Sequence, residues 1–381
     1  EPVREAFQKQ FDDGLNVGGS VAVYLRGRPV VNLWGGTTAP DGGEPWREET
    51  MTIVYSTTKG FTSTCLHVLA DRGLLQYDDL VAKYWPEFAR NGKESITIRH
   101  LLTHQAGIPQ MPEGLAVTDL LDWDTMVRAL EGLSPVWEPG TDSGYHALDF
   151  GWLVGEVVRR IDGRSLGTFL RDEICKPLGI KKLFVGAPES EEHDIAILHS
   201  PARTPEQEAM AKAWMQGNTL ITRAMGMAIN PDSTGANLHD VLNTRRGHAA
   251  AIPAVSGVAC ARDLARFYAC LANYGELDGV RIISEATVRR MSEEQSHRPD
   301  RVLMFVPIRW SLGYMNGGDP GWPQGPRTTS FGHPGAGGSV GFADPAIGMS
   351  FGYVPNMMSM AELTGIGRAS ALADAARACI A

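Results

Sequence analysis

The sequence predicts a protein of the α/β (α+β) class, in which an antiparallel sheet lies beside a mostly helical second lobe. Two observations predict this fold. Strand-like segments occur near both ends of the chain, and the long middle of the chain repeats apolar residues at helical spacing. The 381 residues are 43% hydrophobic, which is enough for a large core and more than one structural lobe.

The N-terminal part is predicted to form a helix, a β-hairpin and a second helix. Val3, Phe7 and Phe11 fall on one helical stripe. A link of three residues, Arg26-Gly27-Arg28, is short enough to join two neighbouring strands as a hairpin. The expected elements, in order, are a helix at 3–14, strands at 19–25 and 29–33, and a helix at 57–72.

The middle of the chain is expected to be helical, and strands return near its end. Helices are expected at 97–105, 117–131, 146–161, 165–175, 205–216 and 262–274, whereas 217–256 is less periodic. Strands are expected at 328–333, 337–343 and 348–354, before a final helix at about 359–379. Strands from the two chain ends would then join in one sheet flanked by the terminal helices. This order predicts a sheet domain of residues 1–85 and 290–381, a mostly helical domain of residues 86–289, and an active site in the cleft between them.

Composition excludes several classes of partner. The net charge of −9 argues against a nucleic-acid partner, and no run of about 18 apolar residues suggests a membrane span. The five cysteines lack C-x-x-C spacing, so we expect free buried thiols, no metal site and no cofactor. A cytoplasmic protein is expected, although an exported form that has lost its leader stays open. The composition does not indicate an oligomeric state.

A serine and a lysine at the start of the helix at 57–72 are the first candidates for catalysis. In Ser56-Thr57-Thr58-Lys59, the two side chains are one helical turn apart on one face. A serine hydroxyl becomes a good nucleophile when a nearby base takes its proton, and burial lowers the pKa of a lysine towards the range where it can do so. The alternative is an ordinary helix cap, because a Ser-x-x-Lys match arises by chance in about one chain in three of this length.

Two further segments could complete such a site. Tyr145 ends a turn-rich loop that begins at Trp137, and a cationic lysine nearby would lower the pKa of its phenol and make it a possible general base. The glycine-rich segment 332–339 lies at the edge of a predicted strand, where glycines let a ligand approach the backbone. A free N–H there, together with the N–H of Ser56, could form an oxyanion hole.

Two other patterns are set aside. Gly337-Gly338-Ser339-Val340-Gly341 fits the G-x-S-x-G nucleophile elbow, but a strand follows it where the elbow needs a helix. No histidine comes after Ser339 to act as its base, since His333 is the last one in the chain. His100 and His104 have H-x-x-x-H spacing without an obvious third ligand, so we expect core or capping residues.

Taken together, these segments resemble the serine β-lactamase-like family, which includes class C β-lactamases, related penicillin-binding proteins, D-alanyl-D-alanine carboxypeptidases and family VIII carboxylesterases. The resemblance covers most of the chain and rests on the segments 56–59, 96–107, 137–145 and 333–335. It implies a β-lactamase/transpeptidase-like fold, an acylated Ser56, Lys59 as its base partner and Tyr145 as the tyrosine that assists proton transfer. It also implies Ala336 N–H as the second oxyanion donor, beside that of Ser56.

Two departures from the family pattern favour esters over β-lactams. Tyr145-His146-Ala147 replaces Tyr-x-Asn, and alanine cannot hydrogen-bond an amide. His333-Pro334-Gly335 replaces Lys-Thr-Gly, whose lysine and threonine help to bind a carboxylate, although a protonated His333 could partly replace the lysine. His333, Gly335 and His146 are the expected substrate-binding residues. We therefore expect a serine carboxylesterase of family VIII type, acting on a small-molecule ester. The alternatives are an acyltransferase, a β-lactamase or D-alanyl-D-alanine carboxypeptidase, and a catalytically silent binding domain.

Overall fold

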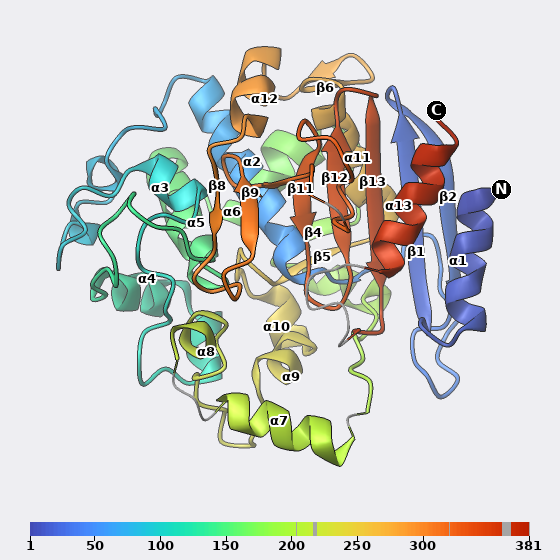
Figure 1. The fold of residues 1–381 in the computed structure, drawn as a ribbon, viewed down its shortest axis with the longest axis horizontal. Helices are drawn as coiled ribbons and strands as arrows, with labels where there is room; N and C mark the ends of the chain where they lie inside the picture. Colours follow the sequence, from blue (N-terminus) through green and yellow to red (C-terminus); the bar gives the residue numbers. More distant parts are fainter. Residues whose placement is uncertain (203, 216–218, 320, 360–366, 381) are drawn as a thin grey trace.

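The antiparallel sheet predicted from the two ends of the chain is present, and it has eight strands. The computed structural model describes residues 1–202, 204–215, 219–319, 321–359 and 367–380. The strand order is β2-β1-β13-β12-β11-β10-β9-β8, and every neighbouring pair is antiparallel. Figure 1 shows the N-terminal and C-terminal strands side by side. The five strands expected from the sequence are β1 Gly18–Leu25, β2 Arg28–Gly36, β11 Phe331–Pro334, β12 Val340–Asp344 and β13 Met349–Pro355.

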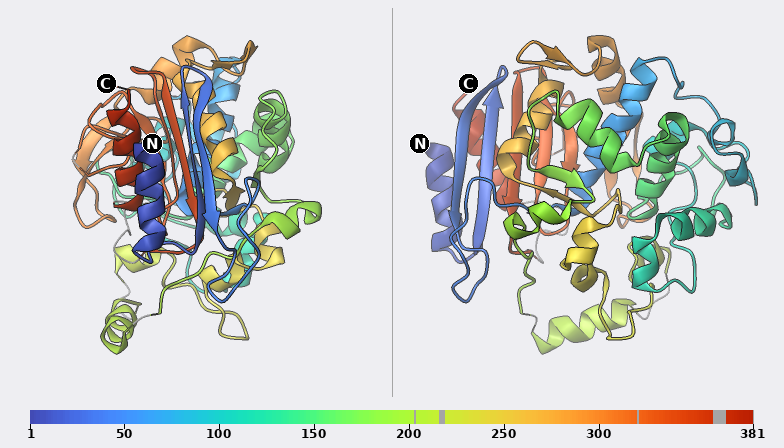
Figure 2. Two further views of the ribbon diagram at one scale, coloured as in Figure 1. Left: turned by 90° about the vertical axis from the view of Figure 1, so that its right-hand side faces the viewer. Right: turned by 180° about the vertical axis from the view of Figure 1, so that it is seen from behind.

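Helices cover both faces of the central strands, and for this reason β13 is buried along its whole length. On one face, α1 (Pro2–Asp12) and α13 (Arg368–Ala378) pack Phe7 and Leu372 against apolar sheet residues such as Phe351. On the other face lies α11 (Ala261–Ala272), as the edge-on view in Figure 2 shows. The final helix was expected from residue 359, but α13 begins at Arg368, and residues 360–366 lie outside the described part of the chain.

The position of α11 differs from the expected division into two domains. The expected helical domain of residues 86–289 includes this helix, whereas α11 packs on the sheet against β1, β12 and β13. Close packing is possible because glycines face it. A Cβ atom at Gly352 would lie 2.6 Å from the carbonyl oxygen of Ala261, and one at Gly341 would lie 2.3 Å from the Tyr268 ring. In outline the two-domain division stays a prediction.

Short strands add to the expected sheet and form two smaller ones. The main sheet continues through β8 Ser296–Pro299, β9 Pro307–Trp310 and β10 Met315–Asn316. A three-stranded sheet combines β3 Thr52–Ile53, β5 Gly257–Ala259 and β4 Leu183–Val185, and a hairpin combines β6 Glu276–Leu277 with β7 Val280–Arg281. Strands of two to four residues show no alternating pattern in the sequence, so periodicity did not predict them.

The helices of the middle of the chain pack around α2 (Thr58–Asp71), which is buried from Thr58 to Leu69. The expected division had placed this helix in the sheet domain. It packs against α5 (Asp149–Asp162) and α6 (Leu166–Leu170). The remaining helices are α3 Ile98–Leu102, α4 Trp123–Glu131, α7 Pro205–Met215, α8 Leu220–Ala224, α9 Leu238–Leu242, α10 Arg245–Ala249 and α12 Glu285–Ser292. In Figure 1, α7 lies at the lower edge of the molecule. Within the described ranges, no helix combines the length and hydrophobicity needed to cross a bilayer.

The cysteines are free thiols, as expected, but not all of them are buried. Burial raises the pKa of the Cys65 thiol well above its ordinary value, so this side chain behaves as a small apolar core residue. Cys379, in contrast, is exposed near the C-terminus. The four buried thiols are those of Cys65, Cys175, Cys260 and Cys270.

Candidate active site

Ser56 lies where a strand of the small sheet leads into α2. β3 ends at Ile53, and a single 3-10 turn, Tyr55–Thr57, precedes the helix. Tyr55 has a φ of +43°, a left-handed conformation that is unfavourable for a bulky side chain. Its hydroxyl bonds His239 Nδ1 at 2.8 Å and its ring stacks on that imidazole, so contacts with α9 support this conformation. The half-buried Ser56 side chain is thereby set at the start of α2.

Lys59 contacts Ser56 from one helical turn further along. Its Nζ lies 3.1 Å from Ser56 Oγ, 2.7 Å from the carbonyl oxygen of Ala147 and 3.3 Å from that of Ala254. The side chain is fully buried. Burial lowers the pKa of Lys59 well below its ordinary value, against an opposing effect of the Asp149 carboxyl. A lysine in this environment can exist as a neutral amine and accept a proton.

Tyr145 completes a group of three side chains around one oxygen atom. Its Oη lies 2.8 Å from Ser56 Oγ, and Lys59 Nζ lies 4.8 Å from the centroid of its ring. The expected effect of the lysine on this phenol is wrong, because burial raises the pKa of Tyr145 above its ordinary value. The phenol therefore stays protonated and donates to Ser56 Oγ at neutral pH.

Two residues outside the predicted site hold the loop that carries Tyr145. Asp300, which is buried between β8 and β9, accepts the backbone N–H of Tyr145 through Oδ1 at 2.9 Å. His104 accepts the N–H of His146 through Nδ1 at 3.0 Å. The centroid of its ring lies 4.2 Å from that of Trp310 and 5.0 Å from that of Tyr145. His104 was expected to be a core or capping residue. Asp300 follows a four-residue strand, and no pattern in the sequence indicated that it would contact the site.

The His333-Pro334-Gly335 segment lies against the segment that carries the nucleophile. Gly335 follows β11, and a Cβ atom there would lie 2.1 Å from the carbonyl oxygen of Val54. Residue 335 is therefore a glycine because the backbone there packs too closely on the segment before Ser56 to leave room for a side chain. Beyond it, Ala336 N–H makes no backbone hydrogen bond within the described part of the chain, so it can donate to a ligand.

Ser339 is a buried structural residue, as expected for a false elbow motif. It lies between the turn at residues 336–338 and β12, and no helix follows it. Its Oγ donates to the carbonyl oxygen of Val54 at 2.7 Å and lies 3.2 Å from Thr57 Oγ1. Ser339 therefore joins the turn that contains Ala336 to the residues on both sides of Ser56.

The two histidines assigned to substrate binding need correction. His146 is 1% exposed, its Nδ1 bonds the carbonyl of Gly144 at 2.7 Å, and its Nε2 accepts the N–H of Ile108 at 3.3 Å. Both nitrogens are thus used by the backbone, and we withdraw the substrate-binding role of His146. His333 packs against the Tyr145 ring, but burial, aided by the charge of Lys59, lowers its pKa to about 3. It is neutral at pH 6 and does not replace the cationic lysine of the family.

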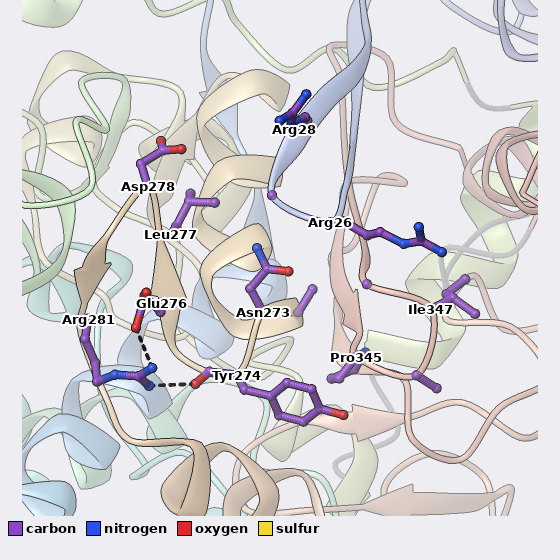
Figure 3. A pocket seen from close by; sticks show the side chains of 14 residues that line it. Arg26, Arg28, Asn273, Tyr274, Glu276, Leu277, Asp278, Arg281, Pro345 and Ile347 are labelled. Carbon is purple, nitrogen blue, oxygen red and sulfur yellow. Dashed lines mark hydrogen bonds and ion pairs between the residues drawn. The ribbon is translucent and has the colours of Figure 1, made fainter.

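A hollow on the surface lies apart from this group. It has a volume of about 660 Å³ and lies between the β1–β2 turn, the end of α11 and the β12–β13 turn (Figure 3). Arg281 in its wall bonds Glu276 and the carbonyl of Tyr274, as the dashed lines show. None of Ser56, Lys59 and Tyr145 lines it. In the described ranges, no set of three or more His, Cys, Asp or Glu side chains is arranged for a metal ion.

The fold and the site together define a class of serine hydrolases in which a lysine, one helical turn after the serine, contacts the nucleophile. Comparison with known families agrees with this class. Residues 3–375 match the family described as Beta-lactamase, and the chain belongs to that family.

Individual relatives cover nearly the whole chain. The chain is 37% identical over 364 residues to the esterase/β-lactamase LipL of Mycobacterium tuberculosis, an alignment that covers 93% of this chain and 81% of that protein. A solved family VIII carboxylesterase shares 38% identity at a TM-score of 0.89, with 99% and 96% of the two chains covered. A penicillin-binding protein homologue from Caulobacter crescentus shares 35% identity at a TM-score of 0.88, with the same coverage. The predicted family and fold are therefore confirmed.

Proposed function

We propose that this serine hydrolase is a carboxylesterase that cleaves short- to medium-chain acyl esters through an acyl-enzyme on Ser56. One observation supports the proposal above all. Ser56 Oγ is contacted by both Lys59 Nζ, at 3.1 Å, and Tyr145 Oη, at 2.8 Å. A nucleophile, a buried amine and a protonated phenol therefore meet at one atom.

In the acylation step, Ser56 Oγ attacks the ester carbonyl carbon while its proton passes to the neutral Nζ of Lys59. The N–H groups of Ser56 and Ala336 are proposed to bind the oxyanion of the tetrahedral intermediate. When the intermediate collapses, the bond to the alcohol breaks, and the alcohol leaves with a proton that Tyr145 donates. The Lys59 ammonium then gives its proton to the Tyr145 phenolate, which restores the phenol and the neutral amine.

In the deacylation step, a water molecule attacks the acyl carbonyl carbon of the acyl-enzyme. The neutral Lys59 amine takes a proton from the attacking water and passes it back through Tyr145. The bond between the acyl group and Ser56 Oγ breaks, and Oγ receives the proton. The products are the free acid and the regenerated enzyme.

The polar side chains that family members use to bind β-lactams are replaced in segments 145–147 and 333–335 of this chain. Ala147 is 4% exposed and its side chain joins an apolar cluster with Tyr145 and Met315. Pro334 offers no side-chain donor, and His333 is neutral. Esters need less leaving-group assistance than amides, so this environment supports ester substrates. The names of two relatives, a family VIII carboxylesterase and an esterase/β-lactamase, support the same class.

The second candidate is β-lactam hydrolysis, which the name of the LipL relative favours. Both reactions would use the same acyl-enzyme and differ in the groups that bind the substrate. The sequence-based expectation of a cytoplasmic protein stays a prediction.

A panel of p-nitrophenyl esters (acetate, butyrate, octanoate), with nitrocefin as the comparator, tests the proposal on one preparation. We expect turnover of the acetate or butyrate ester. The kcat/KM for nitrocefin should be lower than that of a true β-lactamase by about a hundredfold or more, because two lost polar contacts cost about 1–3 kcal/mol each. Nitrocefin turnover equal to or above ester turnover would favour the second candidate. The matched control is Ser56→Ala, which should turn over none of these substrates.

A further inference from the structure

A tyrosine and a histidine that form a pair next to the nucleophile have no place in the steps described above. Tyr55 precedes Ser56, is 8% exposed and has a φ of +43°. Its Oη lies 2.8 Å from His239 Nδ1, and the two rings are parallel to within 3°, with centroids 6.3 Å apart. A bulky residue keeps a left-handed backbone conformation only where surrounding contacts hold it there. Strain of this kind is common beside active sites, so the pair is a candidate for a role in catalysis.

The His239 ring is held at its other nitrogen as well. Its Nε2 lies 3.1 Å from Nδ2 of Asn243, at the end of α9, and 3.2 Å from Ser200 Oγ. Asn243 is itself bonded to the backbone, since its amide accepts the N–H of Leu198 at 2.9 Å and donates to the carbonyl of Leu198 at 3.0 Å. Contacts at both nitrogens therefore fix the orientation of the imidazole that bonds Tyr55.

Tyr55 determines the direction of one of the proposed oxyanion donors. The carbonyl of Tyr55 and the N–H of Ser56 belong to one planar peptide unit. The carbonyl end of this unit accepts the hydroxyl of Thr58, whose Oγ1 also accepts the N–H of Gly257 at 2.9 Å. The backbone angles of Tyr55 set the direction in which the N–H end of the unit points. A change in those angles would therefore turn the Ser56 N–H away from the oxyanion.

On the basis of the proposed acyl-enzyme mechanism, we propose that His239 is a positioning residue, which acts through Tyr55 to hold the Ser56 N–H in place for the oxyanion of the tetrahedral intermediate. The bond to His239 holds the Tyr55 side chain, and the side chain holds the backbone in the left-handed conformation. No proton is transferred along these contacts. An oxyanion donor acts on the charge that develops in the transition state, so its displacement lowers kcat more than it changes KM.

The test compares two replacements of His239 in steady-state hydrolysis of p-nitrophenyl butyrate. In His239→Asn the side-chain amide takes the place of Nδ1 and can still bond the Tyr55 hydroxyl, so kcat should stay within about threefold of wild type. In His239→Gln the amide takes the place of Nε2, and the bond to Tyr55 is lost. We expect kcat of His239→Gln and of Tyr55→Phe to fall by about tenfold to a hundredfold. KM should change by less than about threefold, because acylation and deacylation both pass through an oxyanion.

Two further measurements separate this role from a general loss of structure. The His239→Gln/Tyr55→Phe double variant should be little worse than Tyr55→Phe alone, because both changes remove the same bond. A boronic acid that forms a tetrahedral adduct on Ser56 imitates the intermediate, so its affinity for Tyr55→Phe should fall by about the same factor as kcat.

A matched control is a second pair of the same kind. His67 Nδ1 lies 2.9 Å from Tyr77 Oη, but His67 comes about three helical turns after Ser56, so Tyr77→Phe should leave kcat unchanged. Wild-type kcat in a folded Tyr55→Phe protein, or equal kcat values in His239→Asn and His239→Gln, would overturn the role of His239 and leave the esterase proposal standing. A wild-type protein without ester turnover would instead contradict the esterase proposal itself.

Discussion

The Ser339 hydroxyl donates a hydrogen bond of 2.7 Å to the carbonyl of Val54, two residues before the nucleophile. This bond joins the β11–β12 turn of the large sheet to the segment that leads into α2. The N–H of Ala336, which makes no backbone hydrogen bond among the described residues, lies in that turn, and Ser56 follows Val54 by two residues. Ser339, which lies in a sequence that matches the nucleophile-elbow pattern, thus links the two segments that carry the proposed oxyanion donors.

The first prediction separates the roles of the two serines. Ser56→Ala should abolish ester hydrolysis and labelling by a fluorophosphonate, because it removes the nucleophile. Ser339→Ala should still be labelled at Ser56, with a free energy of unfolding lower by about 1–3 kcal/mol, since the Val54 carbonyl loses a buried hydrogen bond. Peptide mapping and chemical denaturation measure the two effects. The assignment would be reversed if the Ser56→Ala variant were still labelled and lost its label when Ser339 was also changed to alanine.

The second prediction concerns the two groups that contact Ser56 Oγ. Lys59→Ala and Tyr145→Phe should each lower kcat by several orders of magnitude, and the double variant should be little worse than either single one. Groups that act as one proton-transfer unit are strongly non-additive. Steady-state kinetics on a p-nitrophenyl ester measures all four proteins of the cycle. Losses that multiply would mean that one of the two side chains is only structural.

The third prediction tests the support of the Tyr145 loop. Asp300→Ala removes the acceptor for the N–H groups of Tyr145, Val302 and Leu303. We expect kcat to fall by roughly tenfold to a hundredfold, because a displacement of about 1 Å at a reacting group has effects of that size. Labelling of Ser56 by a reactive fluorophosphonate should persist. Wild-type kcat in a folded Asp300→Ala protein would show that Tyr145 does not depend on this carboxylate.

The fourth prediction concerns His333 and the pH dependence of β-lactam hydrolysis. Because burial lowers the pKa of His333 to about 3, its ring stays neutral as the pH falls from 8 to 6. Nitrocefin hydrolysis relative to p-nitrophenyl butyrate hydrolysis should therefore not increase at pH 6. Measuring kcat/KM for both substrates at both pH values checks this. A relative increase at pH 6 that His333→Gln abolishes would indicate a cationic carboxylate anchor after all.

The sequence was informative where one local segment determines the structure. Ser56 and Lys59 are three residues apart at the start of a helix, so their contact follows from helical geometry. The hairpin β1–β2 follows from its alternating strands and its short turn. Tyr145, 89 residues from Ser56, was identified through the order of the family motifs, and the structure brings it to the serine hydroxyl.

The missed features depend on contacts between distant segments or on burial. Asp300 lies 155 residues from Tyr145, and His239 lies 184 residues from Tyr55, so no spacing rule relates them. The direction of the Tyr145 pKa shift was wrong because burial of the phenol raises its pKa and outweighs the opposing effect of its hydrogen bond to Ser56. α11 was placed in the wrong lobe because its periodicity shows one apolar face without saying which element covers it.

The central claim is that an ester substrate acylates Ser56. Rapid acid quenching of the enzyme during turnover of p-nitrophenyl butyrate, followed by intact-mass analysis and peptide mapping, tests it most directly. We predict one added butyryl group, located on the peptide that contains Ser56 and absent from the Ser56→Ala protein. An adduct on a different residue, or turnover by Ser56→Ala at the wild-type rate, would contradict the claim.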